Sequence, residues 1–244
     1  MQKGICRICK ESKLLSFEHI PPRVAFNKDT KYYSIPQVEL LTSKDILEYK
    51  PKGKLNQGGI GDYCLCQECN SFLGRTYVPE FSIFANIAMD VVTKYDVNFI
   101  HLTAYNQFPL KILKQIVSMF VCINEIWYTK SYPELLNFIK DPNENYLPEN
   151  FRISIFLNNE GQIRKWPFVM TSHHGKISEL VFPPFGYILQ LENQSPILKT
   201  TDITFFKNYK IDEVKDIEFT FFKNPTHLPL PIDFRNLDEI KKNI

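Results

Sequence analysis

Cys6-Arg7-Ile8-Cys9 and Cys66-Gln67-Glu68-Cys69 are the two short stretches around which the N-terminal part of this chain is expected to fold. Each is a C-x-x-C unit, and this spacing lets a tight turn present two thiolates to one tetrahedral zinc ion. Clustered cysteines in a reducing compartment are more often metal ligands than disulfides. The sequence therefore predicts one structural zinc ion held by all four sulfurs. The alternative, reduced core cysteines, fits poorly with the polar residues inside and beside both units.

Two further cysteines bear on the ligand assignment. Cys64 lies two residues before Cys66, and side chains two residues apart in an extended segment point to the same face. Cys64 could therefore replace one of the ligands or pack beside the site. Cys122 lies in an apolar run, between Val121 and Ile123, and is interpreted as a core residue.

Composition and charge set the class of protein. The chain has 244 residues, of which 44% are hydrophobic and 14% aromatic, and its formal net charge is +2. Intrinsic disorder is excluded, because it requires few aromatics and a large unbalanced charge. The mild charge is also unlike that of a protein that coats nucleic acid, so any nucleic-acid contact is expected at a local site.

No stretch of the sequence has the properties of a membrane span or a secretory signal. The most apolar run, 116–123, is well short of the roughly 20 residues that cross a bilayer. The N-terminus has no apolar stretch after its basic residues. We therefore expect a soluble, cytoplasmic protein.

The chain divides into two predicted regions with an α+β fold overall. Residues 1–80 contain five of the six cysteines and are expected to form a compact module that needs a metal, because a small core stabilises weakly. Residues 81–244 are expected to pack helices on an antiparallel sheet.

A short helix is expected from Gln67 to Gly74. Apolar periodicity predicts further helices over 109–124 and 133–140, and we favour a helix over a strand for 81–96. Alternating or apolar runs predict strands over 151–157, 163–170, 177–182, 186–191 and 217–222.

The predicted helix over 109–124 is amphipathic. Its apolar residues fall on one stripe, whereas Lys111, Lys114 and Ser118 fall on other faces. Elsewhere, the pair His173-His174 precedes Gly175 and is interpreted as part of a loop rather than a metal site.

A third motif lies between the two cysteine pairs. Glu18-His19-Ile20-Pro21-Pro22 follows the first pair, and Asn70 comes directly after the second. This order resembles the zinc-stapled subset of HNH endonucleases, which have the ββα-metal fold. In that family a C-x-x-C unit precedes an acid-His-Ile-x-Pro segment, and a second C-x-x-C unit is followed by His or Asn. The resemblance covers residues 6–80 only.

The resemblance implies a role for each matching residue. His19 would be the general base that activates water. Glu18, at a position that is more often Asp in the family, would bind the catalytic metal together with Asn70. The family also has a middle Asn that braces the loop. The chain has no match directly before the second cysteine pair, so Asp62 or the more distant Asn56 would have to serve.

Elementary chemistry agrees with these roles. An imidazole with a pKa near 6.5 is suited to take a proton from water at neutral pH. One carboxylate and one amide oxygen suit Mg²⁺ or a similar divalent cation and would bind zinc poorly. Neighbouring residues of a strand point to opposite sides, so a bend after Phe17 is needed to bring Glu18 and His19 to one phosphate. Arg23 and Arg75 are candidates for phosphate contacts.

The sequence thus predicts a metal-dependent HNH-type endonuclease that acts on nucleic acid, with DNA as the expected substrate. The long interval between the cysteine pairs is interpreted as a loop inserted between hairpin and helix. Residues 81–244 would supply target choice, contact with a regulatory protein partner or assembly into a homo-oligomer. Analogy suggests restriction or antiviral defence as a setting. The alternative is a non-catalytic zinc-binding module that contacts protein or nucleic acid, which the mild charge and the unmatched middle Asn favour.

Overall fold

The computed structural model describes residues 2–34, 54–158, 164–171, 175–192 and 196–224. The middle of the insert at 35–53 and the histidine pair His173-His174 lie outside these ranges. The described chain combines helices with antiparallel sheets, which confirms the predicted α+β class.

The N-terminal residues form a three-stranded antiparallel sheet followed by a helix. The sheet has the order β1-β2-β5, with β1 (Gln2–Ile5), β2 (Ser12–His19) and β5 (Gly61–Cys66). Helix α2 (Gln67–Thr76) starts directly after β5. The expected helix end at Gly74 is wrong, because the helix continues to Thr76. Between β2 and β5 lie the short irregular turn η1 (Arg23–Asn27) and a strand pair, β3 (Tyr32–Ser34) and β4 (Lys54–Asn56).

The pairing of β2 with β5 contains a β-bulge. Ser16 lies opposite Leu65 and Phe17 lies opposite Tyr63, so Cys64 is an extra residue in β5. A bulge of this kind bends the strand and increases its twist. The bulge lies between Ser16 and Phe17, close to the place after Phe17 where the roles expected of Glu18 and His19 need a bend.

In the rest of the described chain the predicted helices and strands are present in the predicted order, and the structure adds elements over 99–107, 126–131, 201–202 and 204–208. The helices are α3 (Val78–Lys94), α4 (Pro109–Ile123), α5 (Ile126–Ser131) and α6 (Glu134–Lys140). The larger sheet has the order β11-β7-β10-β9-β8, with β7 (Phe151–Leu157), β8 (Arg164–Thr171), β9 (Gly175–Phe182), β10 (Phe185–Leu191) and β11 (Thr201–Asp202). A separate antiparallel pair joins β6 (Phe99–Gln107) to β12 (Lys215–Phe222). No described helix has both the length and the apolar character needed to cross a membrane.

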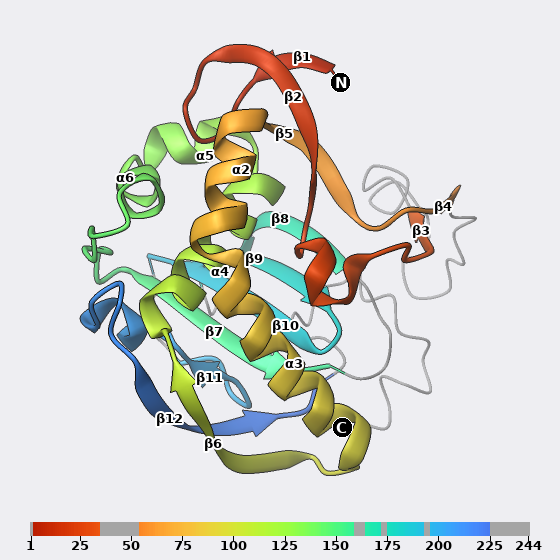
Figure 1. Ribbon diagram of the computed structural model, residues 1–244, viewed down its shortest axis with the longest axis vertical. Helices are drawn as coiled ribbons and strands as arrows, with labels where there is room; N and C mark the ends of the chain where they lie inside the picture. Colours follow the sequence, from red (N-terminus) through yellow and green to blue (C-terminus); the bar gives the residue numbers. More distant parts are fainter. Residues whose placement is uncertain (1, 35–53, 159–163, 172–174, 193–195, 225–244) are drawn as a thin grey trace.

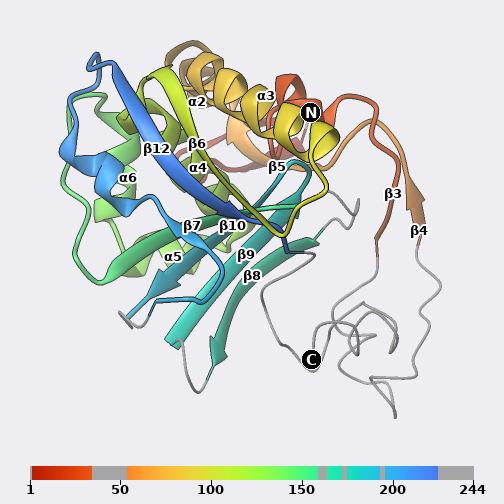
Figure 2. The ribbon, with the colours of Figure 1, turned by 90° about the horizontal axis from the view of Figure 1, so that it is seen from below.

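Helix α4 is the centre of the molecule. It lies between α3 and the five-stranded sheet (Figures 1 and 2), and every residue from Leu110 to Ile123 except Lys111 is buried. The sequence predicts an amphipathic helix in which Lys114 and Ser118 lie away from the buried apolar stripe. This prediction is wrong for both residues, because both are buried. Lys114 can be buried because its ammonium group donates hydrogen bonds to the backbone carbonyls of Phe138, Asp141 and Glu144. Burial lowers the pKa of Lys114 to about 8.

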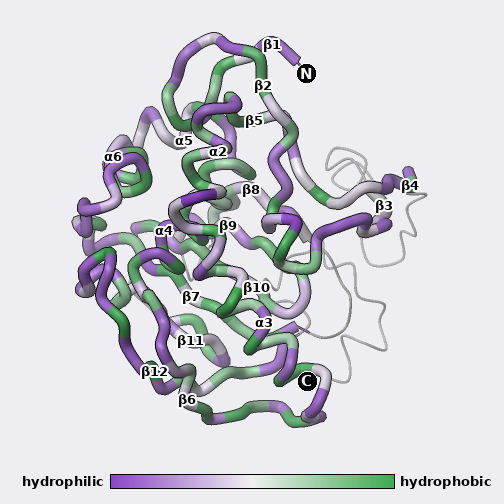
Figure 3. Tube along the Cα trace, in the orientation of Figure 1, coloured by the Kyte–Doolittle hydropathy of each residue, from purple (hydrophilic) through white to green (hydrophobic). Residues whose placement is uncertain are grey.

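The buried side chains of both predicted regions belong to one hydrophobic cluster. Strand β10 is buried along its whole length, β9 is buried from Ile177 to Phe182, and hydrophobic stretches of the chain are green in Figure 3. Polar contacts also join the regions: Arg7 donates to the backbone carbonyl of Cys122, and Lys10 donates to the hydroxyl of Thr129. The N-terminal cysteine turn is thereby attached to the end of α4 and to α5.

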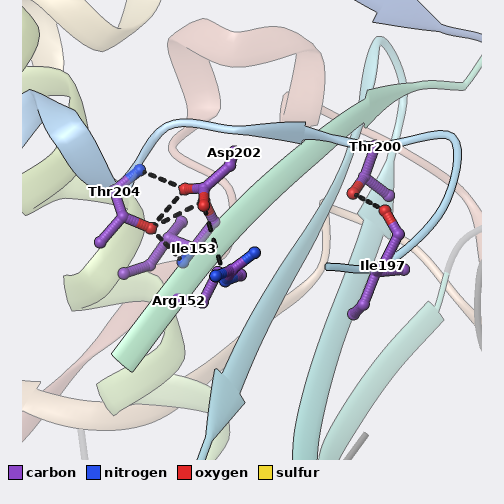
Figure 4. Close-up of polar contacts among 6 residues, drawn as sticks. All are labelled: Arg152, Ile153, Ile197, Thr200, Asp202 and Thr204. Carbon is purple, nitrogen blue, oxygen red and sulfur yellow. Dashed lines mark hydrogen bonds and ion pairs between the residues drawn. The ribbon is translucent and has the colours of Figure 1, made fainter. Parts of the chain in front are cut away.

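Hydrogen bonds and an ion pair around Asp202 fix the edge strand of the five-stranded sheet (Figure 4). The carboxylate of Asp202 accepts hydrogen bonds from the backbone N–H and the hydroxyl of Thr204, at 2.8 and 2.5 Å, and lies 3.6 Å from the guanidinium of Arg152. The backbone N–H of Ile153 donates to the Thr204 hydroxyl at 2.9 Å. These bonds hold β11 and the turn η2 (Thr204–Asn208) against β7. In the neighbouring loop, the Thr200 hydroxyl donates to the Ile197 carbonyl at 2.7 Å.

Candidate metal centre and active site

The four cysteines of the C-x-x-C units meet at one point. The sulfur atoms of Cys6, Cys9, Cys66 and Cys69 all lie within 4.8 Å of one another. The Sγ atoms of Cys9 and Cys66 are 3.9 Å apart. Sulfurs bound to one tetrahedral zinc ion at roughly 2.3 Å would be about 3.8 Å apart. The cluster can therefore hold a metal ion such as zinc, as the sequence predicts.

The local folding of each cysteine pair explains why they converge. Cys6 follows β1 in a tight turn in which Lys10 has a φ of 66° and its N–H donates to the Cys6 carbonyl at 3.0 Å. Cys66 ends β5, and Cys69 lies in the first turn of α2. The metal would thus tie the β1–β2 hairpin to the start of α2.

The thiols of Cys6 and Cys69 contact each other. A hydrogen bond with the Cys69 thiol lowers the pKa of Cys6 to about 4, and the same contact raises the pKa of Cys69. One negative charge is thus favoured on Cys6. A bound zinc ion would favour the thiolate at every position, because thiolates are the form that binds.

Cys64 lies outside the metal cluster of the described residues. It is buried, and its thiol contacts that of Cys122, a hydrogen bond that raises the pKa of Cys122. Of the two alternatives for Cys64, the structure supports packing beside the site. Cys122 is buried, as expected.

A pocket of about 360 Å³ lies between the end of β2, the turn η1 and helix α2. It brings together Glu18, His19 and Asn70, the three residues to which the sequence assigns the chemistry, and it includes Arg23. Arg75 is exposed and is not among the described residues that line the pocket. The complete lining consists of Phe17, Glu18, His19, Pro22, Arg23, Val24, Asn70, Gly74 and Val78.

The carboxyl group of Glu18 is buried and accepts no hydrogen bond from the described part of the chain. Only 8% of the surface of Glu18 is exposed. Burial raises the pKa of Glu18 to about 7. A buried carboxyl without hydrogen-bond donors is stabilised by taking up a proton or by a nearby cation.

The amide of Asn70 is held by Ser16. Its Nδ2 donates to the Ser16 hydroxyl at 3.0 Å, and that hydroxyl donates to the Leu65 carbonyl at 3.1 Å. Because the amide nitrogen is engaged in this way, Oδ1 of Asn70 is the atom left to act as a ligand. No local pattern in the sequence indicates this role of Ser16, because its partner Asn70 is 54 residues away.

His19 is held in one orientation by a glycine-rich loop. Nε2 of His19 lies 3.0 Å from the Gly58 carbonyl, which can only accept, so Nε2 carries the proton and Nδ1 of the neutral ring has a free lone pair. Burial lowers the pKa of His19, which favours the neutral ring at pH 7. Gly59 has a φ of +93°, and a Cβ there would lie 2.8 Å from the imidazole Cδ2.

Asn27 braces the loops around His19. Its Nδ2 donates to the carbonyls of Pro21 and Ile60 at 2.6 and 2.7 Å, and its Oδ1 accepts from the Ile60 N–H at 2.8 Å. Asp62 and Asn56 are the residues that the sequence offers for such a role. Asp62 instead pairs with Arg7 at 3.5 Å, and Asn56 donates to the Lys54 carbonyl.

Comparison of the chain with protein-family models, with curated proteins and with solved structures finds no match. The assignment of function therefore rests on the geometry of the site and on the sequence motifs.

Proposed function

We propose that this protein is a metal-dependent nuclease of the HNH type that hydrolyses phosphodiester bonds, with DNA as the expected substrate. The observation that carries the proposal is that Glu18, His19 and Asn70 line one pocket. Asn70 directly follows Cys69 of the four-cysteine cluster. The strand–strand–helix order of β2, β5 and α2 is the one that the ββα-metal resemblance implies.

Each residue of the pocket has a defined task in this proposal. His19 takes a proton from the attacking water at Nδ1, while the Gly58 carbonyl holds the opposite edge of the ring. The Glu18 carboxylate and Oδ1 of Asn70 would hold Mg²⁺ or a similar cation, which when bound neutralises charge on the phosphoryl group. Arg23, on the wall of the pocket, would contact a phosphate.

Zinc has a structural task in the same proposal. β2 carries Glu18 and His19, whereas α2 carries Asn70. The four thiolates would join these two elements and so fix the distance between base and metal ligands. Residues 81–244 would support this module and contribute target choice, partner contact or self-association.

A non-catalytic zinc module is the alternative. The mild net charge of +2 still fits it. The unmatched middle Asn no longer favours it, because Asn27 supplies hydrogen bonds of the bracing kind. A buried, uncompensated Glu18 next to a neutral His19 favours the enzyme, because a binding module would gain nothing from this costly burial.

The proposal is tested by cleavage of supercoiled plasmid and of single-stranded RNA, with Mg²⁺ and with EDTA. We expect cleavage of DNA with Mg²⁺ and none with EDTA. Glu18→Gln should lower the rate by about 100-fold and raise the Mg²⁺ concentration needed, because a neutral amide binds the cation more weakly.

Glu218→Gln is the matched control for this test. Glu218 is exposed on β12, away from the four cysteines and outside the pocket lining. Its cleavage rate should equal that of the wild type. Cleavage of neither nucleic acid, or equal rates for both variants, would contradict the proposed function.

A further inference from the structure

Gly74 lies inside helix α2 without a local structural reason for being glycine. Its backbone is not in the left-handed region, and a Cβ built on it would meet no atom within 4 Å. Glycine within a helix is less stable than alanine, because its unfolded backbone has more freedom to lose. Neither packing nor backbone conformation therefore accounts for the missing side chain.

The position of Gly74 relative to the pocket suggests a reason. Asn70 and Gly74 are four residues apart in α2 and therefore lie on one face of that helix, and Val78 is the first residue of α3, directly after the junction at Tyr77. All three line the pocket. One helical turn beyond the proposed metal ligand, the helix thus presents bare backbone to the cavity.

The surrounding walls define the chemistry of this part of the pocket. Val78, Pro22 and Val24 give the pocket an apolar wall, and Arg23 carries a positive charge. Apolar surface beside one cation fits a group with an apolar face and an attached anion. A sugar with its phosphate has these properties. The pocket volume of about 360 Å³ lies at the lower end of the range for small-ligand clefts, about 300–1,000 Å³.

We propose that Gly74, Val78, Pro22, Val24 and Arg23 form a subsite for the nucleotide next to the scissile phosphate. The sugar packs against the bare helix at Gly74 and the apolar wall, and Arg23 meets the neighbouring phosphate. This inference rests on the proposed function and adds to it a substrate-contacting surface. Gly74 is glycine because a side chain there would occupy the space of the substrate strand.

The test uses Gly74→Ala and Gly74→Leu in the full chain loaded with zinc. Gly74→Ala should raise the Tm by roughly 2–4 °C, because alanine stabilises the helix. Cleavage of plasmid DNA should nevertheless fall, about tenfold for Gly74→Ala and about 100-fold for Gly74→Leu, because the added atoms displace the strand from the base and the metal. If Gly74 had only a structural role, Gly74→Ala would raise the Tm without lowering the cleavage rate.

Asn86→Leu is the control for added bulk, because Asn86 is exposed on α3 and outside the pocket lining. Its cleavage rate should match the wild type. Equal cleavage by Gly74→Leu and Asn86→Leu would overturn the subsite and leave the nuclease standing.

Binding separates the subsite from the proposed function. In a His19→Ala background, fluorescence anisotropy with a labelled DNA oligonucleotide should show at least about tenfold weaker binding for Gly74→Leu than for Asn86→Leu. A wild type that cleaves nothing contradicts the proposed function and with it the placement beside a scissile phosphate, whereas this binding difference would still show that DNA packs against Gly74. Equal binding by the two variants would overturn it.

Discussion

His19→Ala is expected to lower the rate of Mg²⁺-dependent DNA cleavage by about 10²–10⁴-fold, the usual contribution of a positioned general base. The zinc content and the Tm should stay close to those of the wild type, because the imidazole is only partly buried and makes one hydrogen bond, to the Gly58 carbonyl. Plasmid nicking, metal analysis and thermal unfolding on the same preparation measure all three.

The pH dependence of the wild type gives the same test without a variant. Burial lowers the pKa of His19 from its usual 6.5, so the neutral, proton-accepting ring persists to more acidic pH than for an exposed histidine. Cleavage also requires the ionised Glu18 carboxylate, whose pKa is raised by burial to about 7, so the profile is measured at saturating Mg²⁺, which binds the ionised form. Under that condition cleavage should be maintained at pH 7 and fall as the pH drops through the lowered pKa of His19, and the residual activity of His19→Ala should lack this limb.

His101→Ala is the matched control for the loss of an imidazole. His101 is exposed on β6, and its Nδ1 lies 3.1 Å from the Thr220 hydroxyl, outside the pocket lining. It should cleave at the wild-type rate. A His19→Ala variant that cleaves as fast as His101→Ala would remove His19 from the reaction.

Cys66→Ser is expected to abolish stoichiometric zinc binding and to destabilise the chain. Structural zinc in a four-cysteine site contributes its binding free energy to folding. We expect the free energy of unfolding to fall by about 4 kcal/mol or more, and the Tm by roughly 10 °C. Cleavage should be lost as well, because the metal no longer connects the β1–β2 hairpin to the start of α2. A chelator strong enough to remove zinc should have the same effects on the wild type.

Cys64→Ala provides the control for this prediction. Cys64 is buried beside Cys122 and is not among the clustered sulfurs of the described residues. It should retain one zinc ion per chain and lose only the stability of a small core truncation, about 1 kcal/mol. Zinc analysis and thermal unfolding compare the two variants. Full zinc occupancy in Cys66→Ser, or zinc loss in Cys64→Ala, would contradict the ligand assignment.

The sequence predicts well what depends on local pattern. The helix over 109–124 follows from its apolar periodicity, and the strand 151–157 follows from its alternation; both are present as α4 and β7. The four-cysteine cluster also follows from spacing, because C-x-x-C turns present their sulfurs in the same way wherever the chain brings them together.

The rest depends on contacts between distant residues. Lys114 is buried because α6 and the loop after it place carbonyls around its ammonium group, which no pattern within α4 could indicate. Asn27 braces the site through Ile60, 33 residues further along the chain. Its signal in the sequence is only an asparagine shortly after the Pro-Pro pair. The role of the glycines at 58 and 59 likewise appears only when His19 is placed against them.

The central claim is that four sulfurs hold one metal while Glu18 and Asn70 hold a second, chemically different metal beside His19. Anomalous diffraction from crystals grown with Mn²⁺ tests it directly, because data at the zinc and manganese edges identify each ion. We predict zinc among Cys6, Cys9, Cys66 and Cys69, and manganese in the pocket within bonding distance of the Glu18 carboxylate and Oδ1 of Asn70. Absence of zinc from the sulfurs, or a pocket without manganese in such crystals, would contradict the account.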